Sequence, residues 1–193
     1  MIKILFSVFI LFSLSALYSC TPGGVLASGG ATTMVVAEGD RTLGTVVDDA
    51  TIKINISSNL LSSSTNLFVN VNTSVIEGRV LLTGIVDTQE IRIEAVRKVW
   101  EVDGVKEVIN EIDIGSKTTI KEYANDLWIT TQVKGVAAKT IGLRALSYNF
   151  ETIKGKVYIA GITSRPEQLD EIIEVTKTIK GVKEIVNYVI IKE

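Results

Sequence analysis

The sequence predicts an α+β protein made of two tandem copies of one small module, each with the element order α-β-β-α-β. The stretch Gly104–Asn110 returns as Gly181–Asn187, and the same shift of 77 positions carries Gly78–Gly84 onto Gly155–Gly161. Within each copy, two stretches show helical spacing of apolar residues and three alternate as strands do. A constant shift over this length indicates a repeat without insertions or deletions.

The first 19 residues are predicted to be a signal peptide. Lys3 supplies a short positive region, and an almost unbroken apolar run follows from Ile4 to Leu17. That run is shorter than the ~20 residues that a transmembrane helix needs. The sequence Leu17-Tyr18-Ser19-Cys20 resembles a bacterial lipobox, which predicts that Cys20 is acylated and becomes the first residue of the mature protein. The alternative is an ordinary secreted protein that is cut nearby and has no use for Cys20.

Acyl chains on Cys20 would hold the protein to a membrane surface without making it span the bilayer. In many Gram-negative sorting systems an Asp after the acylated Cys retains the protein in the inner membrane, so Thr21 favours the outer membrane. Residues 20–45 are rich in Gly and contain Pro22, and we expect them to form a flexible tether.

The first repeat is predicted at 46–115. Its first helix is expected to start at Asp48-Asp49, where carboxylates can cap free N–H groups, and to bury Ile52, Ile56 and Leu60 at a spacing of four. The remaining elements are expected to be a strand at 67–75, a turn at 77–78, a strand at 79–86, a helix at 88–102 and a strand at 105–114.

The second repeat is predicted at 123–193 with the same order. Its first helix is expected to start at Asn125-Asp126 and to bury Ile129, Val133 and Ala137. Pro166 suits the first turn of the last helix, and Gly181 suits the end of that helix. Each repeat then has a three-stranded sheet with two helices on one face, a two-layer arrangement.

The composition excludes several kinds of catalytic and metal site. The 193 residues include no His and a single Cys, so a Ser-His-Asp triad, a Cys-His dyad, a His- or Cys-rich zinc site and a disulfide within the chain are all ruled out. No carboxylate pair or phosphate-binding glycine loop stands out. We therefore expect no enzyme, no cofactor, no metal and no small-molecule substrate. A formal charge of −2 and export also argue against nucleic acid as a partner.

The repeats resemble the BON domain, a small module of bacterial periplasmic and membrane-associated proteins. The resemblance rests on the α-β-β-α-β order and on the strands Gly78–Gly84 and Gly104–Val108. Together with the lipobox, two such domains are similar to the dual-BON outer-membrane lipoproteins of Gram-negative bacteria. The resemblance implies binding to anionic phospholipid and a role in keeping the outer membrane intact, and it implies no catalysis.

Comparison of the two repeats suggests where a binding site lies. Trp128 is one residue away from the buried face of its helix, and its equivalent in the first repeat is Thr51. Leu127 likewise corresponds to Ala50. An exposed Leu-Trp pair can enter a bilayer interface, where an indole ring is well placed. The alternative is that Trp128 packs into the groove between the two domains.

The charges of the two repeats also favour a binding site in the second repeat. Residues 46–116 carry six Lys or Arg and 11 Asp or Glu, whereas residues 123–193 carry ten and eight. We therefore predict that the second repeat reads anionic lipid through Leu127, Trp128, Lys134 and Lys139, with the acidic first repeat as a scaffold. The alternative hypothesis is an adaptor that binds other envelope proteins and contacts lipid only through its acyl anchor.

Overall fold

The computed structural model describes residues 41–116 and 118–192. The predicted signal peptide, the acylation at Cys20 and the tether up to residue 40 lie outside these residues. The first half contains α4 (Leu43–Ser63), α5 (Thr65–Asn70), β1 (Val71–Ile76), β2 (Arg79–Val86), α6 (Gln89–Trp100) and β3 (Glu107–Ile114). The second half contains α7 (Ile120–Ile141), the 3-10 helix η2 (Gly142–Ser147), β4 (Tyr148–Ile153), β5 (Lys156–Thr163), α8 (Pro166–Lys177) and β6 (Glu184–Ile191).

The two halves have the same topology and register. Each sheet has its middle strand antiparallel to one neighbour and parallel to the other, in the orders β1-β2-β3 and β4-β5-β6. Val71 pairs with Gly84 in the first sheet, and Tyr148 pairs with Gly161 in the second, again 77 positions later. The predicted fold class and the order of the main elements are confirmed.

One short helix per repeat replaces the start of a predicted strand. Thr65–Asn70 forms α5, although the alternation of residues 67–75 predicted a strand from Leu67 onward. The Ser64 side chain accepts a hydrogen bond from the Asn66 N–H and so caps this turn, while Leu67 is fully buried. In the second repeat η2 takes the same place. In the first repeat, serine capping and a single buried Leu outweighed a short alternating pattern, whereas η2 has no side-chain cap.

The first helix of each repeat starts earlier than predicted. The N-cap of α4 is Thr42, and the helix begins at Leu43 rather than near Asp48. The N-cap of α7 is Thr119, whose side chain and that of Glu122 form a capping box. The predicted role of Asp48-Asp49 as a helix cap is therefore wrong.

Asp49 instead holds the hairpin turn between β1 and β2. Its buried carboxylate accepts the N–H groups of Glu77 at 2.7 Å and Gly78 at 2.9 Å, and it also accepts a hydrogen bond from Arg41. Asp126 makes the two equivalent bonds to the turn between β4 and β5, at 2.7 and 2.8 Å. Each turn has a non-glycine residue with positive φ, which the carboxylate stabilises.

Each repeat has its own apolar core between its helices and one face of its sheet. The first core is built from Ile52, Ile56, Leu60, Leu67, Val71, Val75, Val80, Leu82, Val86, Ala95, Val99, Val102 and Ile112. The second is built from Ile129, Val133, Ala137, Ile141, Tyr148, Phe150, Val157, Ile159, Leu169 and Ile172. The residues predicted to face the core on both first helices are buried as expected.

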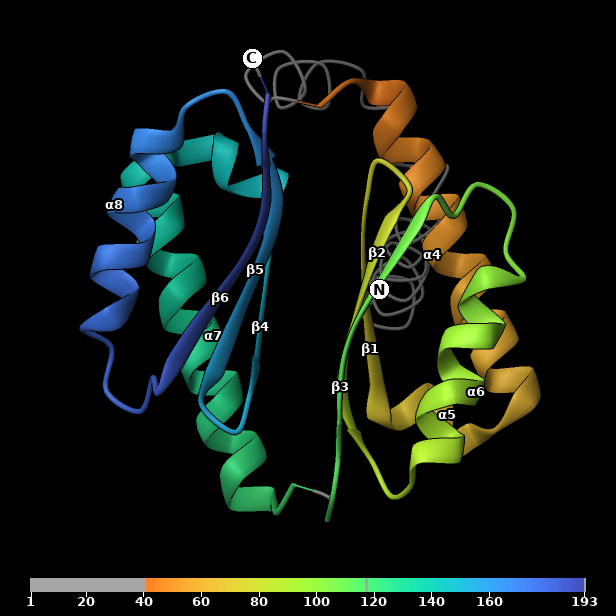
Figure 1. Ribbon diagram of the computed structural model, residues 1–193. Coiled ribbons are helices and arrows are strands. Elements are labelled where there is room, and N and C mark those ends of the chain that lie inside the picture. Colours follow the sequence, from red (N-terminus) through yellow and green to blue (C-terminus); the bar gives the residue numbers. More distant parts are fainter. Residues whose placement is uncertain (1–40, 117, 193) are drawn as a thin grey trace, which may run out of the picture.

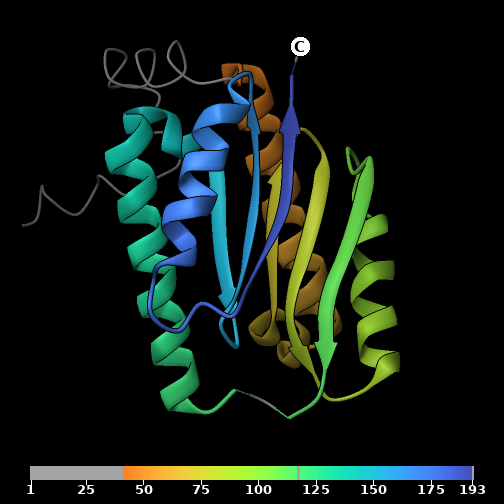
Figure 2. The ribbon, with the colours of Figure 1, turned by 60° about the vertical axis from the view of Figure 1, so that its left-hand side comes forward.

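The opposite faces of the two sheets pack against each other, so the molecule has four layers. Figures 1 and 2 show helices on the outer side of each sheet and the sheets facing one another in the middle. A third apolar cluster fills this seam and includes Ile76, Leu81, Tyr158, Ala160 and Ile162. The two repeats therefore share a buried apolar interface.

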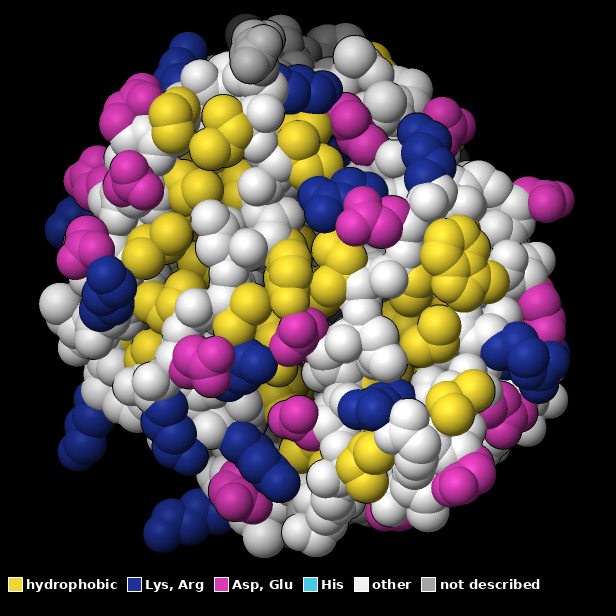
Figure 3. All heavy atoms as spheres, viewed as in Figure 1, with side chains coloured by type: hydrophobic (Ala, Val, Ile, Leu, Met, Phe, Trp, Pro, Cys, Tyr) yellow, Lys and Arg dark blue, Asp and Glu magenta, His cyan; other side chains and the backbone are white. Residues whose placement is uncertain are grey.

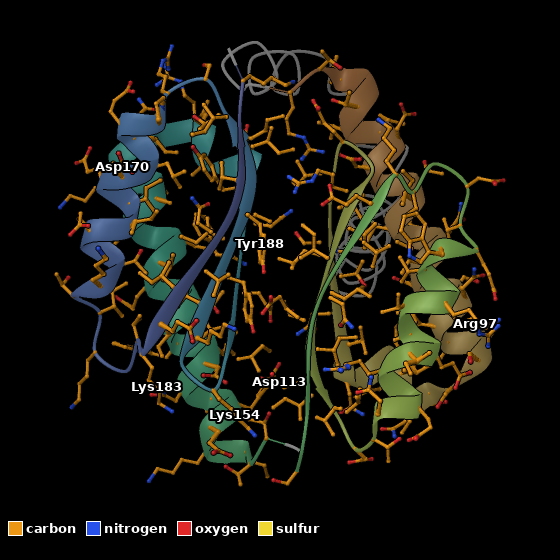
Figure 4. The ribbon with its side chains drawn as sticks, viewed as in Figure 1. Arg97, Asp113, Lys154, Asp170, Lys183 and Tyr188 are labelled. Carbon is orange, nitrogen blue, oxygen red and sulfur yellow. The ribbon has the colours of Figure 1, made fainter. Side chains whose placement is uncertain are left out.

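Charged groups close the seam between the sheets. Tyr188, which Figure 4 labels between the sheets, donates a hydrogen bond to Glu111, and Lys156 donates to the other Glu111 oxygen at 3.1 Å. Burial raises the pKa of Glu111, but these donors outweigh it and hold that pKa below its usual value. Lys192 also pairs with Glu77 across the seam at 2.7 Å. These bonds fix the relative position of the two sheets.

Candidate functional site

The two residues singled out on the first helix of the second repeat are both exposed. Leu127 is 55% exposed and Trp128 46% exposed, while Ile129 beside them is fully buried. Successive residues on a helix point about 100° apart, so Leu127 and Trp128 face different surroundings.

Leu127 lies on a groove between the two domains. The groove has a volume of about 600 Å³ and runs between the first half of α7, β4 and the residues around α5 and β1. Leu127 and Lys134 line it, together with the apolar side chains of Val69, Ile120 and Tyr123. The residues that line this groove do not include Trp128 or Lys139. The structure thus separates the predicted residues into two surfaces.

Two carboxylates, Asp126 and Glu151, line this groove, and Glu151 is the one that bonds across to the other domain. The Asn72 side chain donates a hydrogen bond to it at 3.1 Å from the other domain. Burial raises the pKa of Glu151, although the nearby charges of Lys134 and Lys53 act in the opposite direction. Lys134 therefore acts on a carboxylate of its own protein.

The surroundings of Trp128 are inferred from those of its equivalent residue in the first domain. Its equivalent, Thr51, lines a depression of about 410 Å³ at the end of the domain where the β1–β2 turn meets the loop after α6. That depression is lined by Thr45, Asp48, Asp49, Thr51, Ile52, Glu77, Gly78, Asp103, Gly104 and Lys106. Asp126, two residues before Trp128, holds the β4–β5 turn as Asp49 holds the β1–β2 turn, so Trp128 lies at the equivalent end of the second domain.

The side chains around this end change charge between the domains. Three acids of the first domain are replaced by bases or an amide in the second, as Glu77 becomes Lys154, Asp103 becomes Lys180 and Asp48 becomes Asn125. Lys106 keeps its charge as Lys183. We call the surface of Trp128, Lys154, Lys180 and Lys183 the basic end, and the surface of Thr51, Asp48, Glu77 and Asp103 the acidic end.

Two lysines of the basic end, Lys154 and Lys183, lie close together. The side-chain stem of Lys183 packs over Gly155 in the turn, since a Cβ added there would lie 3.2 Å from it. Hydrogen bonds from Thr119 lower the pKa of Glu122, and the charges of Lys154 and Lys183 lower it further. Figure 4 labels Lys154 and Lys183 at one end of the second domain, and Figure 3 shows Lys and Arg side chains gathered there. A positive surface therefore lies at the end of the second domain that carries the exposed Trp128.

Lys139 lies on the same side of α7 as Trp128 but about 16 Å farther along the helix. It is exposed and lies toward the opposite end of the domain. Lys134 and Lys139 are therefore not the bases that surround Trp128.

Sequence reasoning missed Lys154, Lys180 and Lys183 as a group. Comparing the turn and loop residues at equal repeat positions would have found them, because each replaces or repeats a charged residue 77 positions earlier. It also missed Trp100 at the end of α6, which is 52% exposed. Arg97 and Lys98, the bases next to Trp100 in the sequence, both form ion pairs with Glu101. These two bases therefore do not give Trp100 an unpaired positive charge.

Other kinds of site find no support in the described part of the chain. Residues 41–116 and 118–192 contain no group of His, Cys, Asp or Glu that could hold a metal ion. Within the same ranges, no helix combines the length and the apolar character needed to cross a bilayer.

Sequence comparison finds several similar proteins in other bacteria. The chain is 38% identical over 147 residues to an Anaplasma centrale protein described as "Uncharacterized protein in gshII 5'region". This match covers 76% of this chain and 96% of the Anaplasma protein. It is 29% identical over 160 residues to the outer membrane lipoprotein DolP of Haemophilus influenzae, covering 82% of each chain. It is 31% identical over 154 residues to the 21 kDa hemolysin of Actinobacillus pleuropneumoniae, covering 77% and 78%.

A family model decides the classification. The BON domain model matches residues 48–116 and again residues 125–193, one match for each repeat. The predicted resemblance to dual-BON proteins is confirmed, while the acyl anchor at Cys20 stays a prediction. The chain belongs to the BON domain family and carries two copies of that domain in tandem.

Proposed function

We propose that this protein is anchored by lipid at Cys20, faces the periplasm from the outer membrane, and binds anionic phospholipid through its second BON domain, which supports the integrity of that membrane. The lipobox-like Leu17–Cys20 motif supports the anchor. The likeness to DolP, whose name describes an outer membrane lipoprotein, supports the location.

The observation that carries the lipid proposal is the basic end. An indole at a membrane interface places its ring at the level of the headgroups. Each Lys near an anionic bilayer contributes about 1 kcal/mol of binding free energy. Lys154, Lys180 and Lys183 form no ion pair within the described residues, so their charges are available to a headgroup phosphate.

The candidate residues from the sequence have different places in this proposal. Trp128 is the anchor in the interface. Leu127 and Lys134 lie on the groove beside it, where an acyl chain and a headgroup at the edge of the contact can reach them. Lys139 lies farther along α7 and adds only long-range attraction.

Vesicle cosedimentation tests the proposal. The full chain with Cys20→Ser removes the acyl anchor and leaves the basic end unchanged. We expect it to pellet with vesicles of phosphatidylglycerol or cardiolipin in phosphatidylcholine, to be released by salt, and to stay in solution with phosphatidylcholine alone. Trp128→Ala should weaken pelleting, whereas the matched change Thr51→Ala at the acidic end should not. Binding that is absent, or equal in both variants, would remove the proposal.

The groove between the domains favours a second candidate, an adaptor that holds a segment of another envelope protein. Its rim exposes Val69, Ile120, Tyr123 and Leu127, which are apolar side chains from both domains. In that case the amount of Cys20→Ser protein found in the membrane fraction would depend on whether the partner is present and not on the charge of the lipid. Changing Val69 or Tyr123 to a charged residue would then abolish recovery, although neither lies at the basic end.

A further inference from the structure

The acidic end is a hollow, and the basic end presents a large side chain at the same structural position. The depression in the first domain is lined by Ile52, by Glu77 and Gly78 of the β1–β2 turn, and by the small side chain of Thr51. In the second domain the residue in place of Thr51 is Trp128, which is half exposed. The two domains therefore present an opening and a projecting indole at equivalent ends.

The charges of these two ends are complementary. Asp48 and Asp103 line the depression and form no ion pair within residues 41–116 and 118–192. Glu77 is paired with Lys192 and Asp49 with Arg41, and Lys106 is the base among the lining residues. Two carboxylates without an ion pair thus border the depression, and the end that carries Trp128 has three lysines without an ion pair, two of which act on Glu122.

The two ends point in opposite directions. Figure 1 shows the β1–β2 turn at the top of the molecule and the β4–β5 turn at the bottom. Figure 4 labels Lys154 and Lys183 at that lower end. The acidic end and the basic end of one molecule therefore cannot meet, but those of two molecules can.

We propose that copies of this protein associate head to tail, with Trp128 of one copy seated in the depression beside Thr51 of the next. Lys154 and Lys180 of the first copy then face Asp48 and Asp103 of the second. Different surfaces meet in such a contact, so it leaves a free end on each side and propagates into chains. An aromatic anchor seated in a pocket is typical of an interaction hot spot.

This association is separate from lipid binding and competes with it. The same indole cannot lie in a bilayer and in a neighbouring molecule at once. Exposed ion pairs contribute little each, so the contact is weak in dilute solution. Confinement of the anchored chains to one membrane raises their effective concentration, which favours association there.

Photo-crosslinking of the full, anchored chain in its own membrane tests the proposal. Trp128→p-benzoylphenylalanine keeps an aromatic ring and makes it reactive on illumination. We expect dimers and longer oligomers, with the attached peptide of the neighbouring copy coming from residues 45–52 or 103–106. The combined change Asp48→Lys and Asp103→Lys should reduce the oligomer yield by about tenfold or more, since like charges then face each other.

Charge exchange provides the decisive control. Lys154→Glu with Lys180→Glu should also abolish the oligomers, and mixing this variant with the Asp48→Lys, Asp103→Lys variant should restore them. Asp170→Lys with Glu171→Lys, an equal charge change on exposed residues of α8, should leave the yield unchanged. The Asp48 and Asp103 changes lie away from the basic end, so vesicle binding should not weaken. Adducts to lipid or to another protein alone, or oligomers that survive the charge reversal, would overturn the proposal.

Discussion

The acidic end and the basic end have the same backbone and opposite surfaces. At both ends a buried Asp on the first helix holds the hairpin turn, and a Gly in the turn lies where an added Cβ would be 2.7 Å from the carbonyl of the next loop. These requirements leave Asp49 and Gly78 little freedom to change. The side chains around them face solvent, and there the two domains differ at three charged positions and by one indole. The repeat thus separates residues that the fold requires from residues that are free to serve binding.

Asp49 and Asp126 are the buried carboxylates that both domains share. Replacing them should have the largest effect on the free energy of unfolding. Asp49→Asn leaves Arg41 without its ion-pair partner at a buried position, so we expect a loss of about 3–5 kcal/mol in the free energy of unfolding. Asp126 has no ion pair in the described residues, and Asp126→Asn should cost about 1.5–3 kcal/mol through weaker bonds to the turn. Urea unfolding measures both. Equal losses in the two variants would show that Arg41 adds nothing.

Neutralising the basic end tests the part that differs. Changing Lys154, Lys180 and Lys183 together to Gln should weaken binding to phosphatidylglycerol vesicles by about a hundredfold, at about 1 kcal/mol for each charge. Changing Lys134 and Lys139 to Gln removes two charges that lie away from Trp128, so we expect a smaller loss. A flotation assay at low salt compares the two sets. A larger loss from Lys134 and Lys139 would move the lipid site to the groove side of α7.

A substitution in the seam between the domains should have the smallest effect on the free energy of unfolding, and that effect should depend on pH. The pKa of Glu111 is held below its usual value of 4.5 by bonds from Tyr188 and Lys156 that outweigh burial. The stability from ionised Glu111 is therefore fully present above about pH 4.5 and is lost as the pH falls through its lowered pKa. Glu111→Gln should cost about 1 kcal/mol near neutral pH, and the cost should shrink on acidification.

Glu151 provides the control for this prediction, because burial raises its pKa. Ionisation of Glu151 lowers stability as the pH rises past about 4.5, so Glu151→Gln should leave the neutral-pH stability unchanged or higher. Denaturant midpoints measured near pH 7 and below pH 4 distinguish the two carboxylates. The same response in both variants would contradict their assigned environments.

The element order was predictable because the two copies vary independently around one pattern. Ile52, Ile56 and Leu60 show helical spacing in the first repeat, and Ile129, Val133 and Ala137 show it again in the second. All six are buried. The short helix α5 was not predictable in this way, since Leu67 to Val71 alternates as a strand does and only the Ser64 cap indicates a turn of helix.

The site was only partly predictable, for a geometric reason. The exposure of Trp128 and Leu127 follows from helical spacing alone. The lysines around Trp128 come from a hairpin turn and from the loop after α8, and the sequence does not tell how these segments meet the helix. The packing of the two sheets against each other was also beyond the sequence, because Tyr158 and Ile162 look the same whether they face a core or a second domain.

Fluorescence of Trp128 tests the central claim most directly. Trp100 and Trp128 are the two tryptophans of the sequence, so Trp100→Phe leaves Trp128 as the sole indole in the chain. If the basic end enters the bilayer interface, addition of phosphatidylglycerol vesicles shifts the Trp128 emission to shorter wavelength, and brominated lipid quenches it. An emission that stays unchanged while the protein cosediments with the vesicles would show that lipid is bound elsewhere, and would contradict the account.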